Sequence, residues 1–474
     1  MAVTRRWFLG AGSLGLGTAA IEMMTGRLAA ASTGDREPSF GKAKHIIYLH
    51  MAGSPPQHDL FDPKPVLQKY DMKPCPDSLL DVLKKERLAF IDLKRGRPKL
   101  LASPHSFHAR GDCGMEISSL LPNFGRCADD ICLIRSMTTD QFNHAPAQLM
   151  LYTGAPRFGN ASLGSWVLYG LGTENRNLPG FVVLISGGTD PSGGKSLWGS
   201  GFLPSIYQGV QCRTQGEPIL FVSNPKGLPR TMRRASLDAL KQLNEQELAA
   251  FGDPETATRI RQFELAFRMQ MEVPDVMDIR REPQYVLDAY GASPGKESFA
   301  NNCLLARRLV EHGVRVVQLF DYGWDMHGTS SGNDLLQGLP RKAGDIDRPL
   351  AALMADLKQR GLLDETLLVW SGEFGRTPLN EERNGSKFLG RDHHPHCYSI
   401  WMAGAGVRRG HVVGSTDELG YFVREGKMTV RDLQATILHL LGLDPYRLSF
   451  PYQGLNQRLI GPTDEGRVRR EVLA

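Results

Sequence analysis

Short runs of apolar residues recur along the chain, each bounded by residues that favour turns. The first covers residues 44–50 and ends at a turn rich in glycine and proline, at 52–56. Runs that are apolar at successive positions are typical of parallel strands, which are buried on both faces of their sheet. Five comparable runs follow, at residues 131–134, 181–185, 314–319, 366–370 and 398–402.

Helical periodicity fills much of the chain between these runs, for example at residues 299–312, 346–360 and 430–441. Strands that alternate with helices predict an α/β fold, a mostly parallel sheet sandwiched by helices. An insertion at about 186–295 interrupts the alternation. It starts as a segment rich in glycine, proline and serine, and it continues as charged helical sequence that we expect to cap the core.

The N-terminal residues have the pattern of an export signal. The paired arginines Arg5 and Arg6 precede a weakly apolar stretch rich in glycine and alanine, and a run of small residues that suits cleavage follows. Paired arginines indicate the twin-arginine route, so we expect a periplasmic or extracellular protein with no stable membrane span. The expected organisation is a signal peptide at 1–31, a linker at 32–43, the α/β domain at 44–450 and a C-terminal tail at 451–474.

Charge and cysteine content exclude two classes of protein. The formal net charge of +5 over 474 residues is too small to indicate a nucleic-acid partner. The seven cysteines form no CxxC pair, so a zinc ribbon is not expected.

Histidines and carboxylates gather in three segments that follow predicted strands, at residues 324–328, 371–378 and 391–396. Ligands of open α/β sheets bind at the carboxyl ends of the strands, so we expect these segments to meet. Imidazoles and carboxylates together suit a divalent metal such as zinc, manganese or calcium. For the histidine-rich segment, a solvated loop that binds nothing is the alternative.

The order of several motifs resembles the alkaline phosphatase/sulfatase superfamily, and more closely its sulfatase-like branch named domain of unknown function 1501. The motifs are GSPPQHDLFDPK (53–64), RSMTTDQFNHAPAQLMLYTG (135–154), SLGSW (162–166), WDMHG (324–328), SGEFGRTP (371–378) and DLQATILHLLGL (432–443). They span roughly residues 41–450. The resemblance implies an alkaline phosphatase-like fold, two metals at the strand ends, and a nucleophile at the start of the helix that ends in Thr153-Gly154.

The chain departs from the superfamily pattern where the chemistry is done. His144 stands at the nucleophile position in place of a serine, threonine or formylglycine precursor, and Gln148 stands where sulfatases place an arginine. The Asp-His pair of the superfamily corresponds to Glu373-Phe374. We therefore predict a rewired metal site, to which His144 could add a ligand. Its predicted ligands are His50, Asp59, Asp325, His327, Glu373, His394 and His396.

Two mechanisms remain open for such a site. Water activated by the metal could replace the missing serine, or His144 could itself attack and form a phosphohistidine-like adduct. Arg376 or Lys64 could bind the anionic group of the substrate. A structural ion pair is an equally good interpretation of either residue.

Another polar cluster, His105, His108 and Arg110, precedes a helix that we expect to start near Met115. We expect the cluster to line the same cleft; capping that helix is the alternative.

Two functions of different classes are consistent with these patterns. The first is a periplasmic metal-dependent hydrolase that cleaves an anionic ester, such as a sulfated or phosphorylated glycan. The second is a non-catalytic envelope protein that retains the fold to bind a ligand or glycan. The export signal suits both, the metal-ligand clusters favour the first, and the missing nucleophile favours the second.

Overall fold

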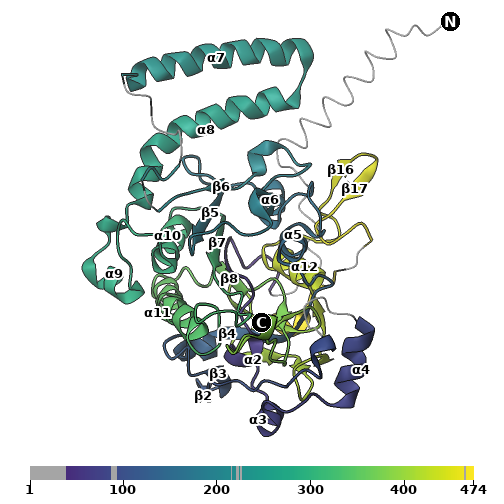
Figure 1. The fold of residues 1–474 in the computed structure, drawn as a ribbon. Helices are drawn as coiled ribbons and strands as arrows, with labels where there is room; N and C mark the ends of the chain where they lie inside the picture. The colour runs from purple at the N-terminus through teal and green to yellow at the C-terminus, as the bar shows by residue number, and fades with distance from the viewer. Residues whose placement is uncertain (1–38, 87–92, 215, 220–223, 225–226, 464–465) are drawn as a thin grey trace, which may run out of the picture.

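The computed structural model describes residues 39–86, 93–214, 216–219, 224, 227–463 and 466–474 (Figure 1). The expected signal peptide, at 1–31, and most of the expected linker lie outside these residues. No helix of the described part is long and apolar enough to cross a bilayer.

A nine-stranded sheet forms the centre of the described chain, and all six predicted strands belong to it. Its order is β12-β4-β11-β8-β1-β7-β5-β6, with β15 paired to β4. Strand β11 runs antiparallel to both of its neighbours, and the other pairs are parallel. The strands are β1 (His45–Ala52), β4 (Ile131–Thr138), β5 (Phe181–Ser186), β6 (Val210–Gln211), β7 (Val316–Tyr322), β8 (Thr366–Ser371), β11 (Tyr398–Gly404), β12 (His411–Val413) and β15 (Met428–Thr429).

Helices cover both faces of this sheet, as the alternating pattern predicted (Figure 1). Successive side chains of a strand point to opposite faces, so Ile47 and Leu49 of β1 join one hydrophobic core while Ile46 and Tyr48 join the other. Helices α10 (Phe299–Glu311) and α11 (Gly338–Gln359) pack on the first core. Helices α5 (His144–Thr153), α6 (Leu163–Leu171) and α12 (Val430–Leu440) pack on the second. The mostly parallel α/β fold is thereby confirmed.

A long insertion lies between β5 and α10. In between lie β6, the long helices α7 (Arg230–Phe251) and α8 (Pro254–Met277), and the short helix α9 (Gln284–Tyr290). Helices α7 and α8 form a hairpin that projects from the body, with α7 outermost (Figure 1). The charged helical sequence therefore forms helices as predicted.

The remaining elements are short and lie outside the large sheet. A strand replaces the helix expected near Met115, because residues 115–118 pair with residues 107–110 as a hairpin. The C-terminal residues pack on the body, where Leu473 bridges to Val407. These elements are α2 (Gln57–Leu60), α3 (Pro65–Tyr70), α4 (Asp77–Glu86), β2 (Phe107–Arg110), β3 (Met115–Ser118), β9 (Gly375–Arg376), β10 (His393–His394), β13 (Ser415–Thr416), β14 (Val423–Glu425), β16 (Phe450–Tyr452) and β17 (Leu455–Gln457).

Candidate metal centre

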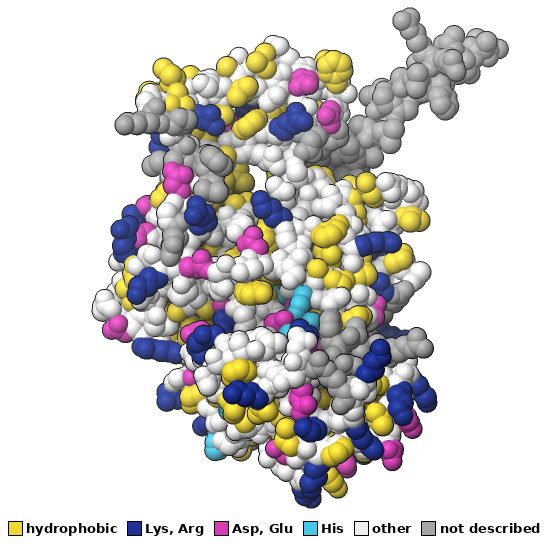
Figure 2. All heavy atoms as spheres, in the orientation of Figure 1, with side chains coloured by type: hydrophobic (Ala, Val, Ile, Leu, Met, Phe, Trp, Pro, Cys, Tyr) yellow, Lys and Arg dark blue, Asp and Glu magenta, His cyan; other side chains and the backbone are white. Residues whose placement is uncertain are grey.

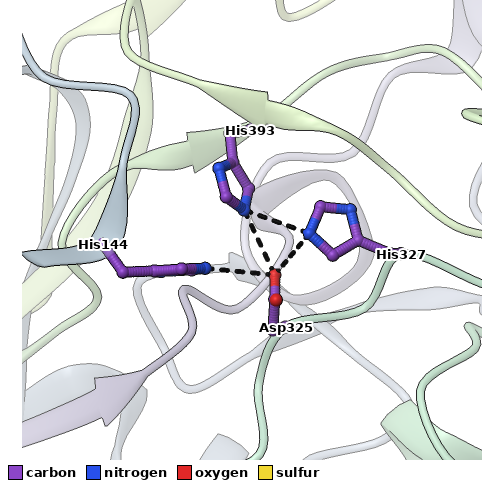
Figure 3. Close-up of side chains that lie close together, drawn as sticks. All are labelled: His144, Asp325, His327 and His393. Atoms are coloured by element: carbon purple, nitrogen blue, oxygen red, sulfur yellow. Dashed lines mark hydrogen bonds and ion pairs between the residues drawn. The ribbon is translucent and has the colours of Figure 1, made fainter. Parts of the chain in front are cut away.

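Four side chains converge at the carboxyl edge of the sheet (Figure 3). His144 is the first residue of α5, Asp325 and His327 lie in the loop after β7, and His393 lies in β10. One ligand atom of each lies within 4.8 Å of those of the other three. Three segments that are far apart in the sequence therefore meet where ligands of open α/β sheets bind.

The Oδ1 atom of Asp325 is the common point of this cluster. The Nε2 atoms of His327, His393 and His144 lie 2.8, 3.2 and 3.4 Å from it. The Nε2 atoms of His327 and His393 are only 3.1 Å apart. Each histidine thus directs the same ring nitrogen toward the same carboxylate oxygen.

The outer ring nitrogens of two of these histidines face carboxylates. Nδ1 of His144 lies 2.6 Å from Oε1 of Glu373, and Nδ1 of His327 lies 2.5 Å from Oε2 of Glu381. Histidines bound to metals have outer partners of this kind, which fix the tautomer and the orientation of the ring. The same device therefore orients both of these rings toward the centre.

The third histidine is oriented by a backbone carbonyl. Nδ1 of His393 donates to the carbonyl oxygen of Phe142 at 2.8 Å. Since a carbonyl oxygen only accepts, the proton of neutral His393 lies on Nδ1 and the lone pair of its Nε2 faces the centre. With their outer nitrogens donating to carboxylates, His144 and His327 present lone pairs in the same way.

Lone pairs that face one another and a carboxylate require a cation between them, either a proton or a metal ion. Burial lowers the pKa of His393 to about 3, so this residue stays neutral. Burial also disfavours the charged form of His144, but hydrogen bonds to Asp325 and Glu373 outweigh it and raise its pKa to about 9. The proton on His144 therefore supplies part of the positive charge that the centre requires, and a divalent ion would supply all of it.

Arg376 lies beneath the cluster and is fully buried. Its Nη2 atom is 2.5 Å from Oδ1 of Asp325, and its guanidinium also donates to the carbonyl oxygens of Gly53, Ser54 and Arg391. Burial raises the pKa of Asp325, but the charge of Arg376 and the hydrogen bond from protonated His144 hold it well below its ordinary value. Arg376 therefore keeps Asp325 ionised and in place.

Glu373 connects the centre to the interior of the sheet. Its Oε2 atom lies 3.3 Å from Nε2 of His50, while Oε1 accepts from the side chain of Gln148 at 3.2 Å and from the backbone of Gly53 at 3.1 Å. Burial opposes ionisation, yet hydrogen bonds to His144 and His50 hold the pKa of Glu373 well below its ordinary value. Both Glu373 and His50 thus support His144 from behind the centre.

One side of the cluster is open. The side chain of Asp325 is 33% exposed and that of His144 is 20% exposed, whereas His327 and His393 are buried. Figure 2 shows histidine at the surface near the middle of this face, with acidic and basic side chains beside it. A metal centre with an open face is typical of catalytic sites, since structural sites are closed by protein ligands.

A family model described as "Protein of unknown function (DUF1501)" matches residues 43–473. The chain belongs to this family. The match spans the whole sheet and all four residues of the cluster. No curated protein matches the chain.

Comparison of this DUF1501 structure with solved structures finds similar folds at low identity. The lipoteichoic acid synthase LtaP from Listeria monocytogenes is 9% identical over 93% of this chain and 80% of that chain, with a TM-score of 0.37. The PsFucS1 sulfatase from Pseudoalteromonas sp. is 12% identical over 96% and 76%, with a TM-score of 0.37. The alkaline phosphatase from the Antarctic bacterium TAB5 is 10% identical over 80% and 96%, with a TM-score of 0.32. Likeness at this level carries no argument about the activity of the DUF1501 chain.

The structure brings six of the ten predicted site residues of this DUF1501 chain together and places four elsewhere. His144, Asp325 and His327 are in the cluster, and His50 and Glu373 stand behind it. Arg376 is buried against Asp325 and has no access to a substrate. The four that lie elsewhere are Asp59, Lys64, His394 and His396.

Each of these four residues has a local partner. The carboxylate of Asp59 forms a fully buried ion pair with Arg391, 2.7 Å from its Nε atom. Lys64 pairs with Asp62 at 2.9 Å. His394 Nε2 lies 2.5 Å from the carbonyl oxygen of Tyr421, and His396 Nε2 lies 3.0 Å from Glu86. Asp59 is therefore held by an arginine away from the cluster. The pair between Lys64 and Asp62 is the structural ion pair that was the alternative interpretation of Lys64.

Sequence reasoning missed His393 and Glu381. In the histidine-rich segment, His393 and His394 are neighbours in the two-residue strand β10 and so point to opposite sides. His393 faces the cluster, whereas His394 faces the ring of Tyr421. The alternation of strand side chains was the available signal. Glu381 had none, because it lies in an irregular segment after β9.

Proposed function

We propose that this protein is an exported, metal-dependent hydrolase of sulfate or phosphate esters whose metal ligands are His144, Asp325, His327 and His393. One observation supports the metal above all. Three imidazoles whose outer nitrogens are held by acceptors direct their Nε2 atoms at one carboxylate oxygen. Export rests on the paired arginines Arg5 and Arg6.

The donor set selects the kind of metal. Three imidazole nitrogens and one carboxylate oxygen suit a transition ion such as zinc or manganese, whereas calcium prefers oxygen ligands alone. Ligand atoms within 4.8 Å of one another are close enough to share a single ion. We therefore expect one zinc or manganese ion per chain, with the open face left for substrate.

A divalent ion bound here would supply Lewis-acid chemistry and lower the pKa of a bound water, which removes the need for a serine nucleophile. His144 acts as a ligand in this scheme because its Nδ1 donates to Glu373 and its Nε2 faces Asp325. Glu373 and Glu381 fix the rings of His144 and His327, and Arg376 fixes Asp325. The attack by His144 itself is disfavoured because neither nitrogen is directed at solvent.

A cavity beside the centre provides room for the rest of an ester substrate. Its volume is about 370 Å³, and its wall includes Thr139, His396, Phe422, Lys427 and Arg431. The loop that begins at Thr139 ends at His144, and His396 follows His393 by three residues, so two of the three segments that build the centre also line the cavity. Its cationic groups and exposed aromatic ring suit an anionic glycan.

Elemental analysis of protein purified without added metal, followed by assays on sulfate, phosphate and phosphonate esters, tests this function. We expect about one zinc or manganese per chain, and loss of both metal and activity in His393→Ala. His108→Ala, an exposed histidine outside the cluster and the cavity, serves as the control and should retain both. A chain that holds no metal under any condition would refute the proposal.

The missing serine nucleophile favours a second function, a non-catalytic envelope protein that binds an anionic glycan. Metal-loaded protein that hydrolyses none of the esters but binds sulfated oligosaccharides at the cavity would establish it.

A further inference from the structure

Within the described residues, the hairpin of α7 and α8 joins the hydrophobic core of the body through α8. The second half of α8 enters the core, where Met269 and Val273 are buried. Helix α7 packs on α8 and is fixed there by a bidentate ion pair between Arg234 and Glu264, at 2.7 and 3.0 Å. Figure 1 shows α7 as the outermost element, with α8 between it and the body. Among the described residues, α7 therefore lies at the periphery of the molecule.

Large apolar side chains line one exposed side of α7, next to its contact with α8. Leu237 is buried toward α8, but Met232, Leu240, Leu243 and Phe251 are exposed, Leu243 by 61% and Phe251 by 81%. Their spacing of eight, three and eight residues places them along one side of a helix with 3.6 residues per turn. Hydrophobic side chains are visible along the hairpin in Figure 2. A continuous apolar stripe of this kind is typical of an interaction surface.

Two charged residues flank the centre of the stripe symmetrically. Arg233 lies seven residues before Leu240, and Glu247 lies seven residues after it. Seven residues are two helical turns, so both charges share the face of Leu240. The stripe therefore has a positive end, an apolar middle and a negative end, and its two charges cancel. A balanced face of this kind is not suited to an anionic membrane, which would require excess positive charge.

We infer that this exposed apolar side of α7 binds the α7 of a second copy of this chain in an antiparallel arrangement, with the two-fold axis at Leu240. A two-fold interface uses the same patch on both copies, so the patch must complement itself. The antiparallel arrangement meets this condition: Arg233 of each copy faces Glu247 of the other, and the apolar side chains meet between them. A parallel arrangement would place like charges together.

Sedimentation velocity of the full chain from 1 to 100 µM tests the interface. The wild type is expected to form a dimer in this range. Leu243→Glu is expected to remain monomeric, because it buries a carboxylate in the apolar middle of the interface. Leu455→Glu is the matched control, since Leu455 is also 61% exposed but lies in β17. It should form dimers as the wild type does. Unfolding temperatures check that each variant is folded.

A charge exchange then tests the antiparallel arrangement. Arg233→Glu alone places like charges opposite each other twice, and we expect the dimer dissociation constant to rise at least tenfold. Adding Glu247→Arg should restore it to near the wild-type value. A monomeric wild type, a dimer that Leu243→Glu leaves intact, or a double variant as weak as Arg233→Glu would each overturn the inference. Binding of a monomeric wild type to phospholipid vesicles would assign the face to lipid and overturn it equally.

Discussion

At the scale of single residues, the candidate centre is defined by which nitrogen of each histidine carries the proton. Acceptors at Nδ1 determine that choice for His144, His327 and His393. Because the acceptors lie outside the cluster, the Nε2 atoms all face inward. The site is therefore organised for a cation before one binds, and its affinity depends on residues that never touch the ion.

Glu381 is the residue through which this dependence is most easily tested. Its carboxylate lies 2.5 Å from Nδ1 of His327, whereas the adjacent Glu382 pairs with Lys99 at 3.0 Å. We expect Glu381→Gln to weaken metal affinity about 10- to 100-fold, because the amide no longer accepts as a carboxylate does. Competition with a chromogenic chelator measures the affinity. Equal losses in Glu381→Gln and in the control Glu382→Gln would contradict the role of Glu381.

His58 gives the protein a predictable sensitivity to acid. It is buried, and its Nε2 lies 3.1 Å from the carbonyl oxygen of Leu419. Burial, with the charges of Arg391 and Lys64, holds its pKa well below the ordinary 6.5. Below pH 6.5, His58 therefore binds a proton in the unfolded chain but not in the folded chain. The free energy of unfolding consequently decreases as the pH falls below 6.5. Above pH 6.5, His58 is neutral in both states and has no such effect.

We expect His58→Gln to show a shallower decline in stability between pH 6.5 and 5 than the wild type. The difference can reach about 1.4 kcal/mol per pH unit, the slope for one proton. Urea unfolding at each pH measures it, and the exposed His108→Gln serves as the control. Identical slopes in the wild type and His58→Gln would show that His58 does not cause the effect.

The residue scale is also where sequence reasoning was least complete. Residues next to the ends of long strands were placed well, since β1, β7 and β8 bring His50, Asp325 and Glu373 to one edge of the sheet. The histidine-rich segment was harder, because side-chain direction there depends on the two-residue strand β10. A shift of one residue changes which side chain faces the centre. The sequence therefore predicted His394 as a metal ligand, whereas His393 is the residue that lies in the cluster.

At the scale of elements, the position of His144 depends on how α5 ends. The helix ends at Gly154 in the left-handed conformation, and a Cβ atom there would lie 1.9 Å from the carbonyl oxygen of Leu459. Gly291 ends α9 in the same conformation, but a Cβ atom there would make only ordinary contact, 3.6 Å from Arg348. Substituting alanine at each glycine therefore distinguishes the conformational cost of a left-handed residue from the steric cost of the added Cβ atom.

We expect Gly291→Ala to cost about 1–2 kcal/mol, the penalty for a left-handed residue with a side chain. Gly154→Ala should cost more, since the backbone at Leu459 or α5 itself must move, and it should also weaken metal binding by displacing His144. Chemical denaturation measures the stability and chelator competition the affinity. Equal stability losses, with unchanged metal affinity in both variants, would show that α5 tolerates the added methyl group.

The element scale was the most predictable. All six apolar runs form strands of one sheet, because a strand that is apolar on both faces is stable only where both faces are buried. The exception near Met115 is informative. Residues 107–110 and 115–118 are too short for pattern alone to separate a helix from a hairpin, and their pairing with each other decides the outcome.

At the scale of the whole molecule, the candidate centre joins three parts of the chain. His144 belongs to α5 on one face of the sheet, Asp325 and His327 to the loop after β7, and His393 to the segment before β11. An ion bound to all four would stabilise the folded chain, since the unfolded chain does not hold these ligands together. By linkage, an ion at 100 times its dissociation constant adds about 2.7 kcal/mol.

For a chain of this length, that gain corresponds to a rise of roughly 2–4 °C in the unfolding temperature. We expect this rise when zinc or manganese is returned to chelator-treated protein. His393→Ala should abolish it, because the remaining ligands come from only two segments and bind the ion weakly. His108→Ala should show the full rise, which excludes binding to surface histidines. A rise of equal size in His393→Ala would place the stabilising ion elsewhere in the molecule. It would show that the four-residue cluster is not the metal centre.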